Sequence, residues 1–463
     1  MKSKFLLPVL CCLIGTGLFA GATYAGESSV EISDEKDEVT ITGEVTDEIL
    51  AEIKKEVGKT KGLVFELKEI ESDEDLEKIC AAFPDMKELS IDEPVELTSI
   101  TPVANLKGLK RFYLNGGTVD DFSPLSGLTG LTSLEIRSND SENGMMAPDL
   151  KWMRKLTNLT DLRIGACSEL RNLVSLEGIP SLPELTAATF TGGAPADLTP
   201  LQALAGLKSL DLTDTVIADL SPLTGLSALE NLSLYGAEVE DFSPLAGCPA
   251  LKELTIYGTS EADYSTLGKL TQLRNLQGGL TRLDDISWIT GMTSLKIYRM
   301  FSEKVTDYTP LAKTQIEDLT IWSMKAPVDL MQLSGVASLK KLKLWNVKNA
   351  SRFEGLASLA NLEELILMGM NAKDGPAVDM AFAASLGNLK ILTLSGSEIS
   401  NFDAVAQCAK LEKVEIDSKT TGIDNLAALK KLPNLAALQV PKNRFSEEDL
   451  AGFANSNIKI LQR

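Results

Sequence analysis

Large apolar residues recur along this chain at a fixed interval. Leu210, Leu232 and Leu254 stand 22 residues apart, and extending that spacing in both directions gives a single register of anchor positions. The anchors are Phe65, Leu89, Phe112, Leu134, Leu162, Leu185, Leu210, Leu232, Leu254, Leu276, Tyr298, Leu319, Leu342, Leu365, Leu392, Val414, Leu438 and Leu461. The spacings stay between 21 and 28 residues, with the longest at Ser138–Asp149 and Asn371–Phe382. A period of this length predicts a stack of repeated units rather than several globular domains.

Each unit predicts one short strand and one return segment. In Leu232-Ser233-Leu234-Tyr235 the side chains alternate, so the leucines are expected to point inward while Ser233 and Tyr235 point outward. The return segments carry Asp-Phe-Ser-Pro-Leu, as at Asp121–Leu125 and Asp241–Leu245. There we expect the serine to cap a helical turn that begins at the proline. One strand and one turn cannot bury their own apolar face, so neighbouring units must stack.

The two ends of the repeat region differ from its middle. Thr46–Val57 and Ser72–Phe83 predict amphipathic helices, and Val39–Ile41 predicts one further strand beside them. A last helix is expected to open at Ser446. Longer helices at these places would cover the open ends of the stack.

The N-terminus has the order of a secretory signal peptide. Lys2 and Lys4 precede an apolar stretch from Phe5 to Leu18, and small residues follow, so we expect cleavage after Ala22 or Ala25. A retained membrane anchor and lipidation at a cysteine are the alternatives. The predicted organisation is a signal peptide at 1–25, a strand and helix cap at 26–59, and a solenoid at 60–463. With no later apolar run long enough to span a membrane, we expect a secreted, periplasmic or cell-surface protein.

The repeat Leu-x-x-Leu-x-Leu followed by Asp-x-Ser-Pro-Leu-x-x-Leu resembles the internalin-like, 22-residue subclass of bacterial leucine-rich repeats. Ser123–Leu128 and Ser221–Leu226 carry the resemblance most clearly. It implies an α/β solenoid with a curved parallel sheet on its concave face and short helices and turns on its convex face. It also implies binding of proteins or other macromolecules on the concave side. The asparagine ladder of the family is reduced here to Thr215, Ala237 and Ser397 in several units.

Composition narrows the range of functions. The chain has no histidine and a formal net charge of −20, which removes histidine-based catalysis and makes nucleic acid a poor partner. Nothing singles out a carboxylate pair, a cofactor site or a metal site, and the oxygen-rich segment Asn139–Asn143 lacks the ordered spacing of a calcium loop. The four cysteines beyond the signal, Cys80, Cys167, Cys248 and Cys408, lie in different units and are expected to be buried free thiols. We therefore expect a protein that is not an enzyme.

One outward column is aromatic in the middle of the repeats. The residues three positions beyond successive anchors are Tyr235, Tyr257, Gly279, Phe301, Trp322, Trp345 and Met368. At a strand spacing of about 4.8 Å they would form a ridge roughly 30 Å long, with a notch at Gly279 and with Arg299 and Lys343 beside it. One interpretation is local stacking of aromatic residues that favour strands. The function predicted here is a monomeric, adhesin-like or receptor-like protein that recognises a protein partner with this ridge, and the alternative is a glycan-binding module.

Overall fold

The structure is a computed structural model that describes residues 22–23, 28–138, 150–173, 176–195, 197–258, 263–279, 283–323, 325–347, 349–370, 377–454 and 458–463. The chain divides into two compact units, Met1–Leu185 and Thr186–Arg463, called unit 1 and unit 2 below. The predicted signal peptide lies outside the described residues apart from Ala22 and Thr23, and so does most of the loop at 138–149.

Unit 1 pairs its strands in chain order. Its elements are β1 (Ala22–Thr23), β2 (Ser29–Ile32), β3 (Glu38–Thr42), α1 (Asp47–Val57), β4 (Val64–Lys68), α2 (Asp73–Ala82), β5 (Glu88–Asp92), η1 (Thr101–Asn105), β6 (Arg111–Asn115), η2 (Ser123–Gly127), β7 (Ser133–Ser138), η3 (Leu150–Lys155), β8 (Asp161–Leu173) and η4 (Ile179–Ser181), where η marks a 3-10 helix. β2 is antiparallel to β1 and β3, and the strands from β3 to β8 are parallel. The predicted strand at Val39–Ile41 is therefore confirmed as part of β3.

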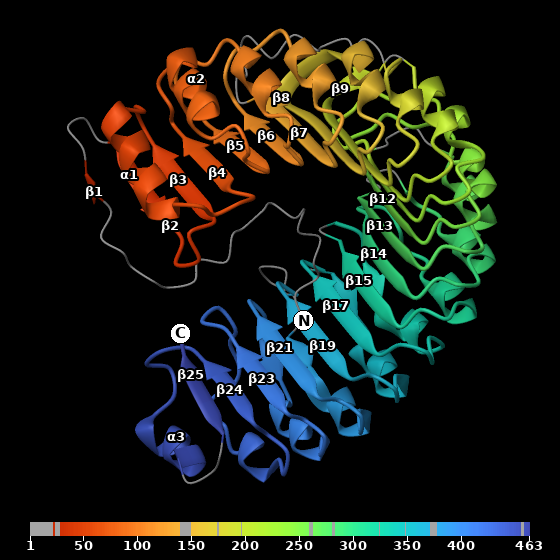
Figure 1. The fold of residues 1–463 in the computed structure, drawn as a ribbon. Helices are drawn as coiled ribbons and strands as arrows, with labels where there is room; N and C mark the ends of the chain where they lie inside the picture. Colours follow the sequence, from red (N-terminus) through yellow and green to blue (C-terminus); the bar gives the residue numbers. More distant parts are fainter. Residues whose placement is uncertain are drawn as a thin grey trace. The chain divides into compact units, whose positions relative to one another are not determined.

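Unit 2 repeats the same alternation of strand and 3-10 helix. Its elements are β9 (Ala187–Pro195), η5 (Thr199–Ala203), β10 (Ser209–Asp211), η6 (Ser221–Leu223), β11 (Asn231–Tyr235), η7 (Ser243–Gly247), β12 (Glu253–Tyr257), η8 (Tyr264–Lys269), β13 (Asn275–Gly279), η9 (Ser287–Gly291), β14 (Ile297–Phe301), η10 (Thr309–Lys313), β15 (Asp318–Trp322), β16 (Val328–Asp329), η11 (Leu330–Leu333), β17 (Lys341–Trp345), β18 (Ala350–Ser351), η12 (Phe353–Ser358), β19 (Glu364–Met368), β20 (Val378–Asp379), η13 (Met380–Ser385), β21 (Ile391–Ser395), β22 (Ile399–Ser400), η14 (Phe402–Gln407), β23 (Lys413–Ile416), η15 (Leu429–Lys431), β24 (Ala437–Val440), α3 (Glu447–Ala454) and β25 (Lys459–Gln462). Within this unit the strands line the inner side and the 3-10 helices the outer side (Figure 1). The predicted fold class is confirmed.

The strand register confirms the predicted anchors with two exceptions. Leu210, Leu232 and Leu254 are direct partners across β10, β11 and β12, and Leu254 is only 1% exposed. The anchor of β9 is Ala188, which pairs with Leu210, whereas the predicted Leu185 is buried just before the strand. The anchor of β25 is Ile460 rather than the predicted Leu461.

The return segments are 3-10 helices, and their caps differ from the prediction. The serine is the first residue of the helix, and its backbone N–H donates to an aspartate two residues earlier, as Ser243 does to Asp241 at 2.7 Å. The serine hydroxyl donates to the same carboxylate at 2.6 Å. The N-cap position is Phe242, which makes no side-chain cap bond. The start of the helix is held instead by Asp241, one residue earlier, and not by the serine that the sequence analysis had named as the cap. These two hydrogen bonds hold the pKa of Asp241 below its ordinary value, the hydroxyl contributing more than the backbone.

The end helices and the described cysteines agree with the predictions. α1 and α2 begin after the caps Thr46 and Ser72, and Ser446 exchanges hydrogen bonds with Asp449 at the start of α3. The described thiols are free and buried, and burial raises the pKa of each of them: Cys80, Cys248 and Cys408. The side chain of Cys167 lies outside the described residues.

Candidate functional site: an aromatic ridge on the strand face of unit 2

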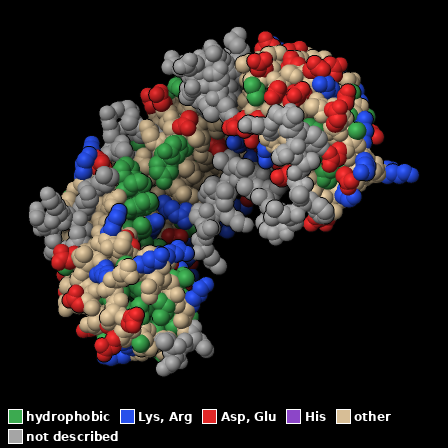
Figure 2. All heavy atoms as spheres, turned by 90° about the vertical axis from the view of Figure 1, so that its left-hand side faces the viewer, with side chains coloured by type: hydrophobic (Ala, Val, Ile, Leu, Met, Phe, Trp, Pro, Cys, Tyr) green, Lys and Arg blue, Asp and Glu red, His purple; other side chains and the backbone are tan. Residues whose placement is uncertain are grey.

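The strand register brings the predicted aromatic column into one row. The partners run from β11 to β19, one residue per strand, and are Tyr235, Tyr257, Gly279, Phe301, Trp322, Trp345 and Met368. We call the six with side chains, Tyr235, Tyr257, Phe301, Trp322, Trp345 and Met368, the aromatic ridge. Tyr235 is 48% exposed and the other five are half-buried. Hydrophobic side chains also gather in a run on the face seen in Figure 2.

The rings of the ridge stand on edge. Trp322 and Trp345 are stacked with centroids 4.6 Å apart and planes 12° apart, which matches the strand spacing of about 4.8 Å. Because each ring comes from a different strand, such stacking turns the ring faces toward the neighbouring strands and the ring edges toward solvent. Phe301 packs edge-on against Trp322 at 5.0 Å and 65°. Apart from the buried Nε1 of Trp322, the middle of the ridge therefore offers ring edges to a ligand.

A lysine covers part of the remaining face of Trp345. The Lys343 Nζ lies 4.5 Å from the centroid of this indole, and Trp322 already occupies one of its faces. The ammonium is attracted to the electron-rich face of the ring, an interaction of about 0.5–2 kcal/mol. Little of either face of Trp345 is left for a ligand.

The prediction of a notch at Gly279 is wrong. A Cβ placed on Gly279 would overlap the Cδ1 of Tyr257 and lie 2.7 Å from its Cε1, so the tyrosine ring leans over the glycine. The ring of Tyr257 also contacts Tyr235, with centroids 5.0 Å apart. A glycine has no side chain to hold a neighbouring ring upright, and the ring fills the space. Burial raises the pKa of Tyr257, while the nearby charge of Arg299 lowers it.

A group of charged residues borders the ridge. Arg299 and Lys343 occupy the outward column next to it, with Thr320 between them. The Arg299 guanidinium lies 3.7 Å from the Asp318 carboxylate. Burial raises the pKa of Asp318, and the neighbouring cations, Arg299 first, oppose the rise. Among the described residues no carboxylate lies within ion-pair distance of Lys343.

The corresponding face of unit 1 is polar and largely paired. On β6 and β5, the Asn115 side-chain amide donates to Asp92 at 2.6 Å. On β7, Arg137 forms an ion pair with Glu135 at 2.5 Å. Tyr113 of β6 is the aromatic residue at an outward position there, and its pKa is raised to about 12, chiefly by burial. A row of large apolar side chains is therefore a local feature of unit 2 and not a general consequence of the repeat.

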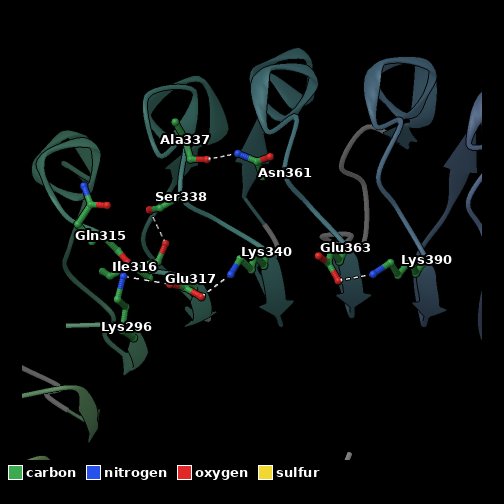
Figure 3. Close-up of polar contacts among 10 residues, drawn as sticks. All are labelled: Lys296, Gln315, Ile316, Glu317, Ala337, Ser338, Lys340, Asn361, Glu363 and Lys390. Atoms are coloured by element: carbon green, nitrogen blue, oxygen red, sulfur yellow. Dashed lines mark hydrogen bonds and ion pairs between the residues drawn. The ribbon is translucent and has the colours of Figure 1, made fainter. Parts of the chain in front are cut away.

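A second row, which the sequence analysis missed, runs along the entry to the strands. Glu317 pairs with Lys296 at 3.0 Å and with Lys340 at 2.7 Å, and Glu363 pairs with Lys390 at 2.8 Å (Figure 3). We call these residues, each two positions before an anchor, the charge ladder. The alternation of sign at one position of the 22-residue period was the signal in the sequence. Exposed pairs of this kind contribute about 0.2–1 kcal/mol each. Because each pair joins two neighbouring units, the charge ladder supports the stacking of the units.

The described part of the chain contains no group of three or more His, Cys, Asp or Glu side chains placed to hold a metal ion. Within the same residues, no helix is long and apolar enough to cross a membrane. The oxygen-rich segment Asn139–Asn143, for which no calcium site was predicted, lies outside the described residues.

Comparison of the sequence with protein-family profiles and with curated proteins finds no match. Among solved structures, TLR13 in a complex with ssRNA13 is similar with a TM-score of 0.63 and 17% identity, over 94% of this chain and 64% of that one. An internalin, InlF, from Listeria monocytogenes is 23% identical, with a TM-score of 0.42, over 72% of this chain and 81% of that one. A leucine-rich-repeat protein from Leptospira interrogans is 14% identical, with a TM-score of 0.49, over 90% and 92%. The likeness to TLR13 shows the fold of this chain and not its function.

Proposed function

We propose that this leucine-rich-repeat solenoid is an exported binding protein without enzymatic activity, which recognises a protein partner through the aromatic ridge. Large apolar groups open to water are costly to maintain, and aromatic side chains dominate the binding energy of protein interfaces. The six ridge residues are distributed over a row of seven strands that is roughly 30 Å long. That length suits an interface of standard size, about 800 Å² on each side.

The orientation of the rings is the observation that favours a protein partner over a glycan. A sugar ring packs on the face of an aromatic side chain, and the faces of Trp322 and Trp345 are turned toward each other. Lys343 lies over the indole of Trp345 as well. Ring edges and the side chain of Met368 are instead suited to interdigitate with apolar side chains of a polypeptide.

Nucleic acid is a weaker candidate. TLR13 was solved with ssRNA13, yet the present chain carries a net charge of −20. Binding to a phosphate backbone depends on clustered lysine and arginine, and the two cations in the column beside the ridge, Arg299 and Lys343, are separated by Thr320. We therefore retain a polypeptide as the ligand class.

Export is the part of the proposal that rests on the N-terminal sequence. Lys2 and Lys4 followed by the apolar stretch from Phe5 to Leu18 favour passage through a membrane and removal of the segment. Cell fractionation with N-terminal sequencing tests this directly. We expect a protein outside the cytoplasm that begins after Ala22 or Ala25, and an unprocessed cytoplasmic protein would contradict it.

The binding test compares the wild type with the double variant Trp322→Ala/Trp345→Ala. Both proteins are immobilised and exposed to surface-protein extracts and to a panel of soluble polysaccharides. We expect a protein that binds the wild type and not the double variant, because aromatic anchors contribute about 2 kcal/mol or more each. Tyr113→Ala, which removes an outward aromatic side chain from unit 1, is the matched control and should bind as the wild type does.

Each alternative gives a different result. A polysaccharide that binds the wild type and not the double variant would replace the protein partner with a glycan. If the double variant unfolds much more readily than Tyr113→Ala, the stacked rings serve local stability. If a bound protein is retained equally by all three proteins, the binding site lies away from the ridge.

A further inference from the structure

The charged group beside the ridge restricts the chemistry of the partner. Seven successive outward positions next to the ridge are Ser233, Thr255, Gln277, Arg299, Thr320, Lys343 and Ile366. This column contains two cations and no carboxylate, in a chain with 65 acidic and 45 basic residues. The cations stand two strands apart, about 10 Å, beside Phe301 and Trp345. The two cations therefore lie directly next to the ridge, whereas the carboxylates Asp318 and Glu364 lie in the outward column on the other side of them.

The pairing of these cations inside the protein is incomplete. Arg299 contacts Asp318 at 3.7 Å, a distance beyond that of a good charge-assisted hydrogen bond. Lys341, one residue before the anchor of the same strand, is already paired with Glu364 at 3.0 Å. Lys343 is held over the indole of Trp345 and, among the described residues, has no carboxylate within ion-pair distance. Its ammonium retains the capacity to pair with an incoming anion.

From these observations we infer that the partner is a polypeptide segment in which acidic residues flank apolar ones. The apolar side chains pack against the ring edges of the ridge, and a carboxylate pairs with Lys343. A second acidic group about 10 Å away faces Arg299. This inference rests on the proposed function, because it describes the partner of the same ridge.

The geometry of Lys343 explains why a carboxylate would be selected. The indole holds the lysine side chain in place, so less side-chain entropy is lost when a partner pairs with its ammonium. The carboxylate then approaches next to the ring edge, where water is excluded by the packed apolar groups. Charge pairs in such surroundings are stronger than those in bulk water.

The experiment is a selection of random dodecapeptides displayed on phage, carried out with the intact protein. The selection uses four proteins: wild type, Lys343→Glu, Lys343→Met, and the control Lys313→Glu. Lys313 ends the 3-10 helix η10, on the opposite side of the units from the strands, so the control has the same charge change as Lys343→Glu. Selected peptides are synthesised, and their affinities are measured by calorimetry against all four proteins and against Trp322→Ala/Trp345→Ala.

We expect the wild type and Lys313→Glu to enrich peptides that combine Asp or Glu with large apolar residues. Affinity for these peptides should fall about tenfold in Lys343→Met and further in Lys343→Glu, and its dependence on salt should weaken in both. Lys343→Glu should instead enrich peptides with Lys or Arg. Melting temperatures of the four proteins identify any variant that does not fold, and Lys343→Met, which keeps the packing on Trp345, provides the measurement if Lys343→Glu fails.

Two results would overturn the inference. Peptides that require Trp322 and Trp345 but show no acidic preference would contradict it while leaving the proposed function intact. The same would hold if Lys343→Glu selected the same acidic peptides as the wild type. By contrast, the absence of any peptide that depends on the two tryptophans would contradict the proposed function itself.

Discussion

Replacing Gly279 by alanine tests the geometry of the ridge with a single methyl group. The backbone at Gly279 does not adopt a positive φ, so alanine fits the strand, but its Cβ would overlap the ring of Tyr257. A carbon 2.7 Å from Cε1 must move by about 1 Å to reach the ordinary contact distance of about 3.5–4.0 Å. We expect the ring of Tyr257 to be pushed away from the sheet.

The effect on stability should be small. Alanine in place of glycine within a strand contributes about 0.5–1 kcal/mol to stability, because an alanine loses less conformational entropy on folding than a glycine does. Loss of the contact between Tyr257 and Tyr235, whose centroids are 5.0 Å apart, costs about 0.5–1.5 kcal/mol. The two contributions nearly cancel, so the free energy of unfolding should change by less than about 1 kcal/mol. Chemical denaturation measures this change.

The displaced ring should be detected by its titration. Burial raises the pKa of Tyr257 in the wild type, and lifting the ring toward solvent should lower this pKa toward the ordinary value of about 10. Ultraviolet difference titration, with Tyr257→Phe as the subtraction reference, reports this group alone. Gly387→Ala, where an added Cβ has nothing within 4 Å, is the control. An unchanged Tyr257 titration in Gly279→Ala, or a loss of more than about 2 kcal/mol of stability, would refute the arrangement described here.

Four further predictions concern the core and the caps. Leu254→Asp buries a charge at a position 1% exposed, so we expect the free energy of unfolding to fall by about 4 kcal/mol or more in urea, and wild-type stability would mean a wrong register. Tyr298→Phe removes a buried hydroxyl with no hydrogen-bond partner among the described residues, so thermal stability should be unchanged or higher by about 1 kcal/mol; a clear loss would reveal a partner. The pKa of Asp241 is lowered in the folded state, so its stabilisation is complete above about pH 4 and is lost as the pH falls through the lowered folded pKa. Asp241→Asn should therefore make thermal stability below about pH 4 less dependent on pH, and an unaltered acid profile would contradict this. Finally, Cys248 and Cys408 should react with a thiol reagent only on unfolding, because both are buried with raised pKa values, and rapid reaction in the native state would count against their burial.

The sequence predicts the stack because the period is carried by large apolar residues. The predicted register is wrong at β9, where the anchor is the small Ala188. Leu182 and Leu185 of the preceding return segment have the same three-residue spacing as the apolar residues at the start of a strand, so Leu185 was chosen instead. At the last strand both Ile460 and Leu461 are apolar, so alternation alone cannot choose the inward residue. Where neither ambiguity arises, the register follows from spacing.

Side-chain orientation is the part of the candidate site that the sequence does not determine. Alternation predicts that Tyr257 and Trp322 point outward, and the register agrees. It does not predict that the Tyr257 ring leans over Gly279, because that depends on the space between neighbouring strands. The capping of the return segments is similar: Asp241 and Ser243 are both plausible caps by residue type, and only the local geometry selects the aspartate.

The charge ladder bears on how such a protein can change its length during evolution. Repeat arrays gain and lose units by unequal recombination, and each new junction must be compatible. Loss of the unit that carries Glu317 would place Lys296 beside Lys340, replacing two attractive pairs with a repulsive one. Each exposed pair is worth only about 0.2–1 kcal/mol, yet the change of sign disfavours this deletion relative to one that removes two adjacent units and restores the alternation. Charges that take no part in the ridge thus weakly favour some deletions over others in this part of the stack.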